Sequence, residues 1–223
     1  MESKYVPIET LISTAAKEIA DEIQKVVNQR GICSLGLSGG KSPILLYEKM
    51  AKLLPQAIIR KLVIFLVDER YTDFKSPDSN YKLVKDHFIF HLISSPKRFI
   101  YPLPFLPLEE ATAQYQEDLK DFTPFDILIL GLGEDGHTAS LFPGEEYLNN
   151  DGKLIITTPR EHANYKRLSL SLSAIIASRK LFFYVPGKNK EEILQKISQN
   201  GDSYPAGRVL IRHKHTLLYR EKL

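Results

Sequence analysis

One histidine of this sequence stands where acid–base chemistry is possible. His137 follows the glycine-rich stretch Gly131–Gly136, two residues after Asp135. An imidazole titrates near neutral pH, so it can take a proton from water and later return it to a leaving group. The alternative is a histidine that only hydrogen-bonds within its own loop, and we assign the remaining five to that alternative: His87, His91, His162, His213 and His215.

A glycine-rich segment near the N-terminus has the composition of an anion-binding turn. It consists of Ser38, Gly39, Gly40, Lys41 and Ser42, between an expected strand and an expected helix. Glycines let the backbone approach an anion, and the free N–H groups and dipole of a helix start favour negative charge. The segment is not a P-loop, because the glycine spacing and the Gly-Lys-Ser/Thr ending are missing. A tight turn with a helix cap is the alternative interpretation.

Four further charged residues are candidates for the same site. Asp68 and Arg70 follow one apolar run, and Lys190 follows another. Each could instead be surface charge or part of a structural ion pair. Arg167 directly precedes an apolar run. From strand direction alone we therefore expect it at the opposite edge of the sheet.

Several other kinds of chemistry find no support in the sequence. Gly131, Gly133 and Gly136 match a dinucleotide-binding pattern, but no acid ends the following strand, so we expect no cofactor. No His, Cys and carboxylate grouping has metal-ligand spacing, so we expect no metal. The single cysteine, Cys33, excludes an intramolecular disulfide. The absence of a Gly-x-Ser-x-Gly elbow disfavours a serine esterase.

Apolar runs and amphipathic segments alternate along the chain and predict the elements that must position these residues. We expect helices over 8–31, 42–54, 107–122 and 191–199, and strands over 32–37, 62–67, 126–131, 154–158, 168–172, 181–185, 209–211 and 216–219. The segments 73–80 and 94–107 are rich in polar residues or proline, and we expect them to be irregular. This alternation predicts an α/β fold with a mostly parallel sheet and helices on both faces.

Ligands bind such sheets beyond the carboxyl ends of the strands. Four expected strands end in polar or glycine-rich sequence: Ser38–Ser42, Asp68–Arg70, Gly131–Thr138 and Pro186–Lys190. Four such clusters at one edge of one sheet predict an active site there.

Charge and hydropathy exclude some partners. The 223 residues carry 30 Lys and Arg against 27 Asp and Glu, a net charge of +3. That balance is too small to suggest nucleic acid or a membrane surface as partner. The longest nearly apolar stretch, 125–132, is far shorter than the ~20 residues of a spanning helix. Without a signal-like start, we expect a cytoplasmic protein.

Motifs along nearly the whole chain resemble the 6-phosphogluconolactonase family. In chain order they are Leu37–Gly40, Asp68–Arg70, Ser79–Tyr81, Gly131–Gly144, Arg167–Ser171, Gly187–Lys190 and Pro205–Ala206. The family shares a superfamily with glucosamine-6-phosphate deaminase and ribose-5-phosphate isomerase. The resemblance therefore implies a single Rossmann-like domain over residues 1–223. It also implies hydrolysis of 6-phospho-D-glucono-1,5-lactone to 6-phosphogluconate in the oxidative pentose phosphate pathway.

The resemblance also suggests roles for the residues that could react. We expect His137 to activate water against the lactone carbonyl and then to protonate the departing ring oxygen. Backbone N–H groups around Gly133–Gly136 are expected to stabilise the oxyanion. Asp68 would orient sugar hydroxyls or Arg70, and Asp135 would hold His137, although the sequence alone does not separate these two roles.

The substrate phosphate is assigned to the cationic residues and the first glycine-rich turn. We expect it to contact the Ser38–Ser42 segment, Arg70 and Lys190, with Arg167 as a further candidate. Lys41 stands where the family commonly has Ser or Thr, and the tryptophan usual in the last strand is missing. We expect these departures to affect packing and the affinity for substrate more than the proposed base, His137.

Three alternatives accompany this hypothesis. In the deaminase the matching motif, Gly-His-Ile-Ala-Phe-Asn-Glu-Pro-Gly, carries a glutamate that assists ring opening, whereas Phe142 stands at the aligned position here. A sugar-phosphate sensor would need an output segment, for which the chain has no spare length. An inactive homologue is disfavoured by the His137 motif. The expected partner is a small sugar-phosphate lactone, and the expected state a monomer or weak homo-oligomer.

Overall fold

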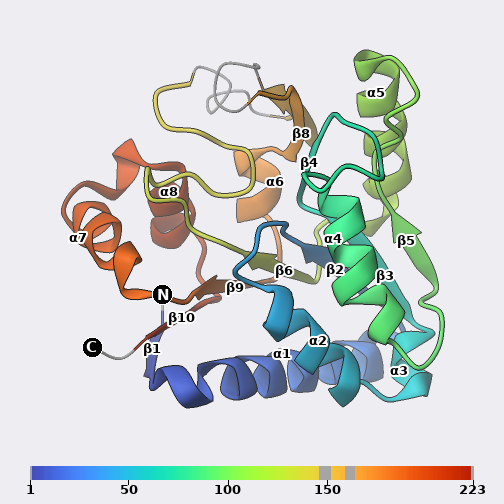
Figure 1. Cartoon of the computed structure of the whole chain (residues 1–223), viewed down its shortest axis with the longest axis horizontal. Coiled ribbons are helices and arrows are strands. Elements are labelled where there is room, and N and C mark those ends of the chain that lie inside the picture. The colour runs from blue at the N-terminus through green and yellow to red at the C-terminus, as the bar shows by residue number, and fades with distance from the viewer. Residues whose placement is uncertain (1, 146–151, 159–163, 222–223) are drawn as a thin grey trace.

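A parallel sheet forms the centre of the molecule (Figure 1). The computed structural model describes residues 2–145, 152–158 and 164–221. Within these ranges the sheet has seven strands, in the spatial order β1 (Glu2–Val6), β10 (Thr216–Glu221), β9 (Lys180–Val185), β6 (Ile127–Leu130), β2 (Cys33–Leu37), β3 (Leu62–Leu66) and β5 (Arg98–Ile100). All neighbouring strands in it are parallel. The predicted α/β fold with a mostly parallel sheet is therefore confirmed.

Two hydrophobic cores cover the two faces of this sheet. Leu62, Ile64 and Leu66 of β3 point into one core, and Val63 and Phe65 point into the other, because side chains alternate along a strand. The first core is completed by α1 (Ile8–Arg30), α2 (Ile44–Leu53), α3 (Gln56–Ile59) and α4 (Asn80–His87). The second core is completed by α5 (Leu108–Leu119), α6 (Leu172–Ile176), α7 (Glu191–Asn200) and α8 (Pro205–Arg212). Both faces are thus buried, which explains the continuous apolar runs of the central strands.

A small antiparallel sheet lies outside the parallel one. Within the described ranges it contains β4 (Asp68–Arg70), β8 (Arg167–Leu170) and β7 (Ile155–Thr158), in that order. Two predicted strands, 154–158 and 168–172, therefore exist in shorter form but belong to this second sheet. The register pairs Arg70 with Arg167. The expectation that Arg167 lies at the opposite sheet edge is wrong, because β8 runs antiparallel to β4 and not within the parallel sheet.

The prediction of a strand at 209–211 is also wrong. These residues belong to α8, in which Ala206, Val209 and Leu210 are buried at helical spacing. A three-residue apolar run cannot distinguish a strand from a buried helix turn by periodicity. The irregular segment expected at 94–107 contains the edge strand β5, and α4 begins at Asn80, where the other irregular segment was expected to end.

Glu69 joins the small sheet to α4. Its buried carboxylate accepts hydrogen bonds from the backbone N–H groups of Arg70, Asn80 and Tyr81 at 2.6–2.7 Å, and from Ser79 Oγ at 3.2 Å. The first N–H groups of a helix have no partner within the helix, so this carboxylate satisfies two of them. Burial raises the pKa of the Glu69 carboxyl to about 7, because the hydrogen bonds offset only part of the desolvation. Glu69 thereby fixes the start of α4 next to β4.

The Glu69→Gln variant is expected to have a free energy of unfolding about 2 kcal/mol lower than that of the wild type. The amide replaces one acceptor oxygen with an NH2 group, which would face backbone N–H donors. Urea denaturation measures the difference, and Glu110→Gln on the exposed side of α5 is the matched control. Equal stability of the Glu69→Gln variant and the wild type would contradict this role.

Candidate active site

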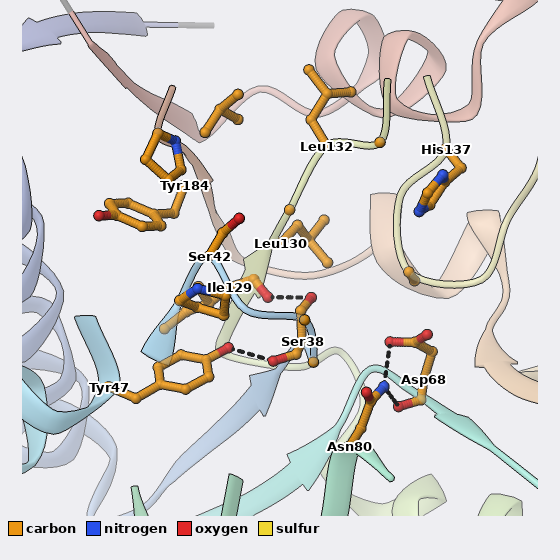
Figure 2. A pocket seen from close by; sticks show the side chains of 18 of the residues that line it. Ser38, Ser42, Tyr47, Asp68, Asn80, Ile129, Leu130, Leu132, His137 and Tyr184 are labelled. Carbon is orange, nitrogen blue, oxygen red and sulfur yellow. Dashed lines mark hydrogen bonds between the residues drawn. The ribbon is translucent and has the colours of Figure 1, made fainter. Parts of the chain in front are cut away.

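A pocket opens at the carboxyl ends of β2, β6 and β9 (Figure 2). It brings together most of the residues predicted from the sequence: Ser38, Gly39, Gly40, Ser42, Asp68, Arg70, Gly133, His137, Arg167 and Lys190. Lys41 is exposed and does not line the pocket, and neither do Asp135 and Gly136. The predicted clusters at the ends of β2, β6 and β9 therefore converge with β4 on one concave surface.

The Ser38 hydroxyl is used to hold the wall of the pocket. Ser38 Oγ donates to the carbonyl oxygen of Ile129 at 2.8 Å, which joins the ends of β2 and β6. Tyr47 Oη in turn donates to the Ser38 carbonyl oxygen at 2.8 Å, as Figure 2 shows. The adjacent Gly39 and Gly40 present backbone to the pocket, with Gly40 at a φ of 86° that favours glycine. This turn offers backbone groups rather than the Ser38 hydroxyl to a ligand.

Asp68 is held from two sides. Asn80 Nδ2 donates to the Asp68 carbonyl oxygen at 2.8 Å and to Oδ1 at 3.3 Å, and Ser140 Oγ donates to Oδ2 at 2.6 Å. Asn80 also packs against Gly39, where a Cβ would lie 1.8 Å from Asn80 Oδ1. Asp68, Asn80 and Ser140 are all buried. The carboxylate thus serves as an anchor between three segments of the chain.

Among the described residues, three cationic side chains line the pocket. Arg70 Nη1 donates to the Asp78 carbonyl oxygen at 2.6 Å, and Arg167 Nη1 donates to Ser140 Oγ at 3.4 Å. Among the described residues neither arginine Nε has a hydrogen-bond partner, although both are buried. Burial, together with the neighbouring Arg70 charge, lowers the pKa of Arg167. Guanidinium groups in such surroundings are suited to binding an anion such as a phosphate.

The third cation, Lys190, is tied to the loop that carries His137. Its Nζ lies 3.6 Å from Glu134 Oε1, and the same oxygen accepts a hydrogen bond from Asn189 Nδ2 at 2.5 Å. Glu134 thus connects the turn after β9 with the loop after β6. This connection holds Lys190 at the rim of the pocket.

His137 and Asp135 form a hydrogen-bonded pair. Asp135 Oδ1 lies 2.5 Å from His137 Nδ1 and accepts a second hydrogen bond from the His137 backbone N–H at 3.1 Å. Partial burial opposes ionisation of Asp135, but these bonds and the histidine charge outweigh it and lower its pKa to about 2. The carboxylate is therefore ionised at neutral pH and orients Nδ1–H toward itself. His137 Nε2 is then the ring nitrogen that can accept a proton.

The loop of His137 is a tight turn that depends on glycine. Gly133 N–H donates to the His137 carbonyl oxygen at 2.9 Å, and Gly136 N–H donates to the Gly133 carbonyl oxygen at 3.1 Å. Ala206 N–H, in the first turn of α8, donates to the Gly136 carbonyl oxygen at 3.1 Å. The N–H groups of Gly133 and Gly136 are thus engaged within the loop in this conformation. Of the oxyanion donors expected around Gly133–Gly136, these two are therefore already paired in this conformation, and the expectation for the other N–H groups of the turn stays a prediction.

Gly133→Ala is expected to lower kcat about 100-fold with a small change in KM. A Cβ at this position would lie 2.0 Å from His137 Nδ1 and 2.5 Å from Asp135 Oδ1, so the pair must move. Steady-state kinetics measures the effect, and circular dichroism checks that the variant is folded. A folded Gly133→Ala protein with wild-type kcat would show that catalysis does not depend on the position of the His137–Asp135 pair.

Several pocket residues were not identified from the sequence as part of the site. Tyr47, Asn80 and Tyr184 line it, and Ser140 lies beneath it on Asp68. The sequence feature that could have identified Asn80 is the Ser79–Tyr81 motif, which contributed to the family resemblance but was given no role in the site. Among the described residues, no three or more His, Cys, Asp or Glu side chains come together in a way that could hold a metal ion. Over the same ranges, no helix combines the length and the apolar character needed to cross a membrane.

These features define an α/β protein with a cation-lined pocket and a histidine–aspartate pair at the carboxyl edge of a parallel sheet. A family model described as glucosamine-6-phosphate isomerases/6-phosphogluconolactonase matches residues 8–218, and the chain belongs to this family. The resemblance found in the sequence is thereby confirmed.

Similar proteins cover nearly the whole chain. The 6-phosphogluconolactonase of Helicobacter pylori is 36% identical over 82% of this chain and 81% of its own length. A probable 6-phosphogluconolactonase of Dictyostelium discoideum is 32% identical, covering 92% and 91%. The crystal structure of 6-phosphogluconolactonase from Thermotoga maritima is 26% identical and superimposes with a TM-score of 0.88, covering 99% and 98%.

Proposed function

We propose that the chain hydrolyses 6-phospho-D-glucono-1,5-lactone to 6-phospho-D-gluconate. The names of its relatives support this activity. The observation that carries the proposal is that His137, paired with Asp135, lines the same pocket as Arg70, Arg167 and Lys190. A base for activating water thus lines the same pocket as cations for a phosphorylated substrate.

His137 acts first as a base and then as an acid. Nε2 takes a proton from water while the water oxygen forms a bond to the lactone carbonyl carbon. The tetrahedral intermediate then collapses, the bond between this carbon and the ring oxygen breaks, and the imidazolium returns the proton to the ring oxygen. The ionised Asp135 stabilises the imidazolium between the two steps. The new carboxylic acid releases its proton to solvent.

The cations bind the phosphate and keep the lactone in reach of His137. Arg70 and Lys190 are assigned to the phosphate together with the backbone of the turn at 38–42, and Arg167 is the further candidate. Asp68 positions neighbouring groups through Asn80 and Ser140 rather than transferring protons, since both of its oxygens accept hydrogen bonds.

Three wider inferences accompany this function. We infer a single domain over residues 1–223, supported by two cores packed on opposite faces of one sheet. We infer a cytoplasmic location, for which the scarcity of cysteine is the supporting observation. A monomer or weak homo-oligomer stays a prediction, which sedimentation of the purified chain tests.

Substrate comparison tests the proposed function. Freshly prepared 6-phosphogluconolactone, unphosphorylated gluconolactone and glucosamine 6-phosphate are offered to the wild-type protein, with spontaneous hydrolysis subtracted. We expect kcat/KM for the phosphorylated lactone to exceed that for the unphosphorylated one at least about 100-fold, as charged phosphate contacts require. No ammonia is expected from glucosamine 6-phosphate. Ammonia release without lactone hydrolysis would favour the deaminase alternative instead.

A further inference from the structure

The aromatic ring of Phe142 lies next to two functional side chains. Its centroid is 5.0 Å from the centroid of the His137 ring, with the rings tilted by 42°. The guanidinium carbon of Arg167 lies 5.6 Å from the same Phe142 centroid. Both distances are typical of favourable aromatic and cation–π contacts. One ring therefore contacts both the proposed base and a cation of the pocket.

The segment that carries Phe142 is rigidly held. Leu141 is fully buried and its N–H donates to the Thr138 carbonyl oxygen at 3.0 Å. The Ser140 N–H donates to Ser169 Oγ at 3.2 Å, which ties the segment to β8. Phe142 itself is only 5% exposed. Its ring is thus packed in place against His137 and Arg167, which line the pocket, and is not a mobile side chain at the surface.

Two residues of this segment, Ser140 and Phe142, contact Arg167. The Ser140 hydroxyl accepts from Arg167 Nη1 at 3.4 Å, while the Phe142 ring contacts the guanidinium carbon. The hydroxyl fixes one edge of the guanidinium group and the ring limits its movement on another side. The buried Nε of Arg167, without a partner among the described residues, leaves the group dependent on these contacts.

We propose that Phe142 is a positioning residue that sets the placement of the His137 imidazole relative to the Arg167 guanidinium. The proposal rests on the proposed function, in which one side chain activates water and the other helps to hold the substrate. A phenyl ring has no proton to transfer, so Phe142 acts only through its two neighbours. Loss of the ring therefore affects kcat through His137 and KM through Arg167.

Steady-state kinetics of Phe142→Leu and Phe142→Tyr tests this proposal. Leucine keeps an apolar side chain but removes the ring face, whereas tyrosine keeps the ring. We expect Phe142→Leu to lower kcat about 10-fold and to raise KM about 5-fold, and Phe142→Tyr to stay within about 3-fold of the wild type in both constants. Phe105→Leu, at a phenylalanine that is 73% exposed, is the matched control and is expected to leave both constants unchanged. Rates are measured at a temperature at which thermal unfolding shows every variant folded.

A double-mutant cycle separates positioning from a general structural role. If Phe142 acts through Arg167, the effects of Phe142→Leu and Arg167→Gln on KM are less than additive. Additive effects on KM, a folded Phe142→Leu variant with wild-type constants, or a Phe142→Tyr variant as impaired as Phe142→Leu would each overturn the proposal.

Binding of inorganic phosphate distinguishes failure of this inference from failure of the proposed function. Nuclear magnetic resonance titration requires no turnover, and Phe142→Leu is expected to weaken phosphate binding several-fold in the wild-type background but not in Arg167→Gln. If the wild type fails to hydrolyse the lactone while this pattern is found, the proposed function is wrong and the placement of Arg167 by Phe142 stands. Equal weakening of phosphate binding by Phe142→Leu in both backgrounds would overturn the proposed role of Phe142, whichever reaction the chain catalyses.

Discussion

His137→Ala is expected to lower kcat for the phosphorylated lactone about 1,000-fold, with KM changed by no more than a few-fold. The variant removes the proposed base but leaves Arg70, Arg167 and Lys190 in the pocket. Substrate binding should therefore survive while activation of water is lost. The coupled formation of 6-phosphogluconate, corrected for spontaneous ring opening, measures both constants.

The control for this variant is a histidine outside the pocket. His215 is exposed and lies just before β10, at the opposite end of the parallel strands from the pocket, and His215→Ala is expected to keep the wild-type kcat. Retention of full activity by His137→Ala would remove His137 from the mechanism, although membership of the family would stand. A large rise in KM with unchanged kcat would instead assign His137 to binding.

Arg70→Gln and Arg167→Gln are each expected to raise KM about 10- to 100-fold, with a much smaller effect on kcat. Both guanidinium groups are partly buried in the pocket, and each contains a buried Nε without a partner among the described residues. A charge-assisted bond to phosphate in such surroundings is stronger than a neutral hydrogen bond. Glutamine retains a polar side chain but loses the charge, so the loss reports mainly on the charge.

The unphosphorylated lactone provides the decisive comparison for these variants. The kcat/KM for this lactone is expected to change less than about 3-fold in Arg70→Gln and Arg167→Gln, because the lactone has no phosphate that could contact the arginines. Arg60→Gln, an exposed arginine at the end of α3, is the matched control. Equal losses for both lactones would show that these arginines act on the lactone ring or on the fold and not on the phosphate.

The central strands of the parallel sheet were predictable because they are buried on both faces, whereas the more exposed edge strands β1 and β5 were not predicted. The apolar runs at 32–37 and 62–67 correspond to β2 and β3, and long amphipathic spacing marks α1. The small antiparallel sheet was not recognised, since β7 and β8 look like any other short apolar run. Pairing partners are set by tertiary contacts, and this is why Arg167 was expected at the wrong edge.

The candidate site was predictable where its residues lie close together in sequence. The His137 motif combines its base, its partner Asp135 and the glycines of the turn within seven residues, 131–137. The anchors of Asp68 were not predictable, because Asn80 and Ser140 reach it from separate segments through hydrogen bonds. The engaged hydroxyl of Ser38 was missed for the same reason, since its acceptor is the carbonyl oxygen of Ile129 on another strand.

The rate at which the wild-type chain converts freshly prepared 6-phosphogluconolactone tests the central claim most directly. The product is trapped by 6-phosphogluconate dehydrogenase as it forms, and the rate is measured at several protein concentrations. We predict a rate proportional to protein concentration, well above spontaneous opening, and saturable by the lactone. A rate equal to the spontaneous one at every protein concentration would contradict the proposed activity and leave a sugar-phosphate sensor as the better hypothesis.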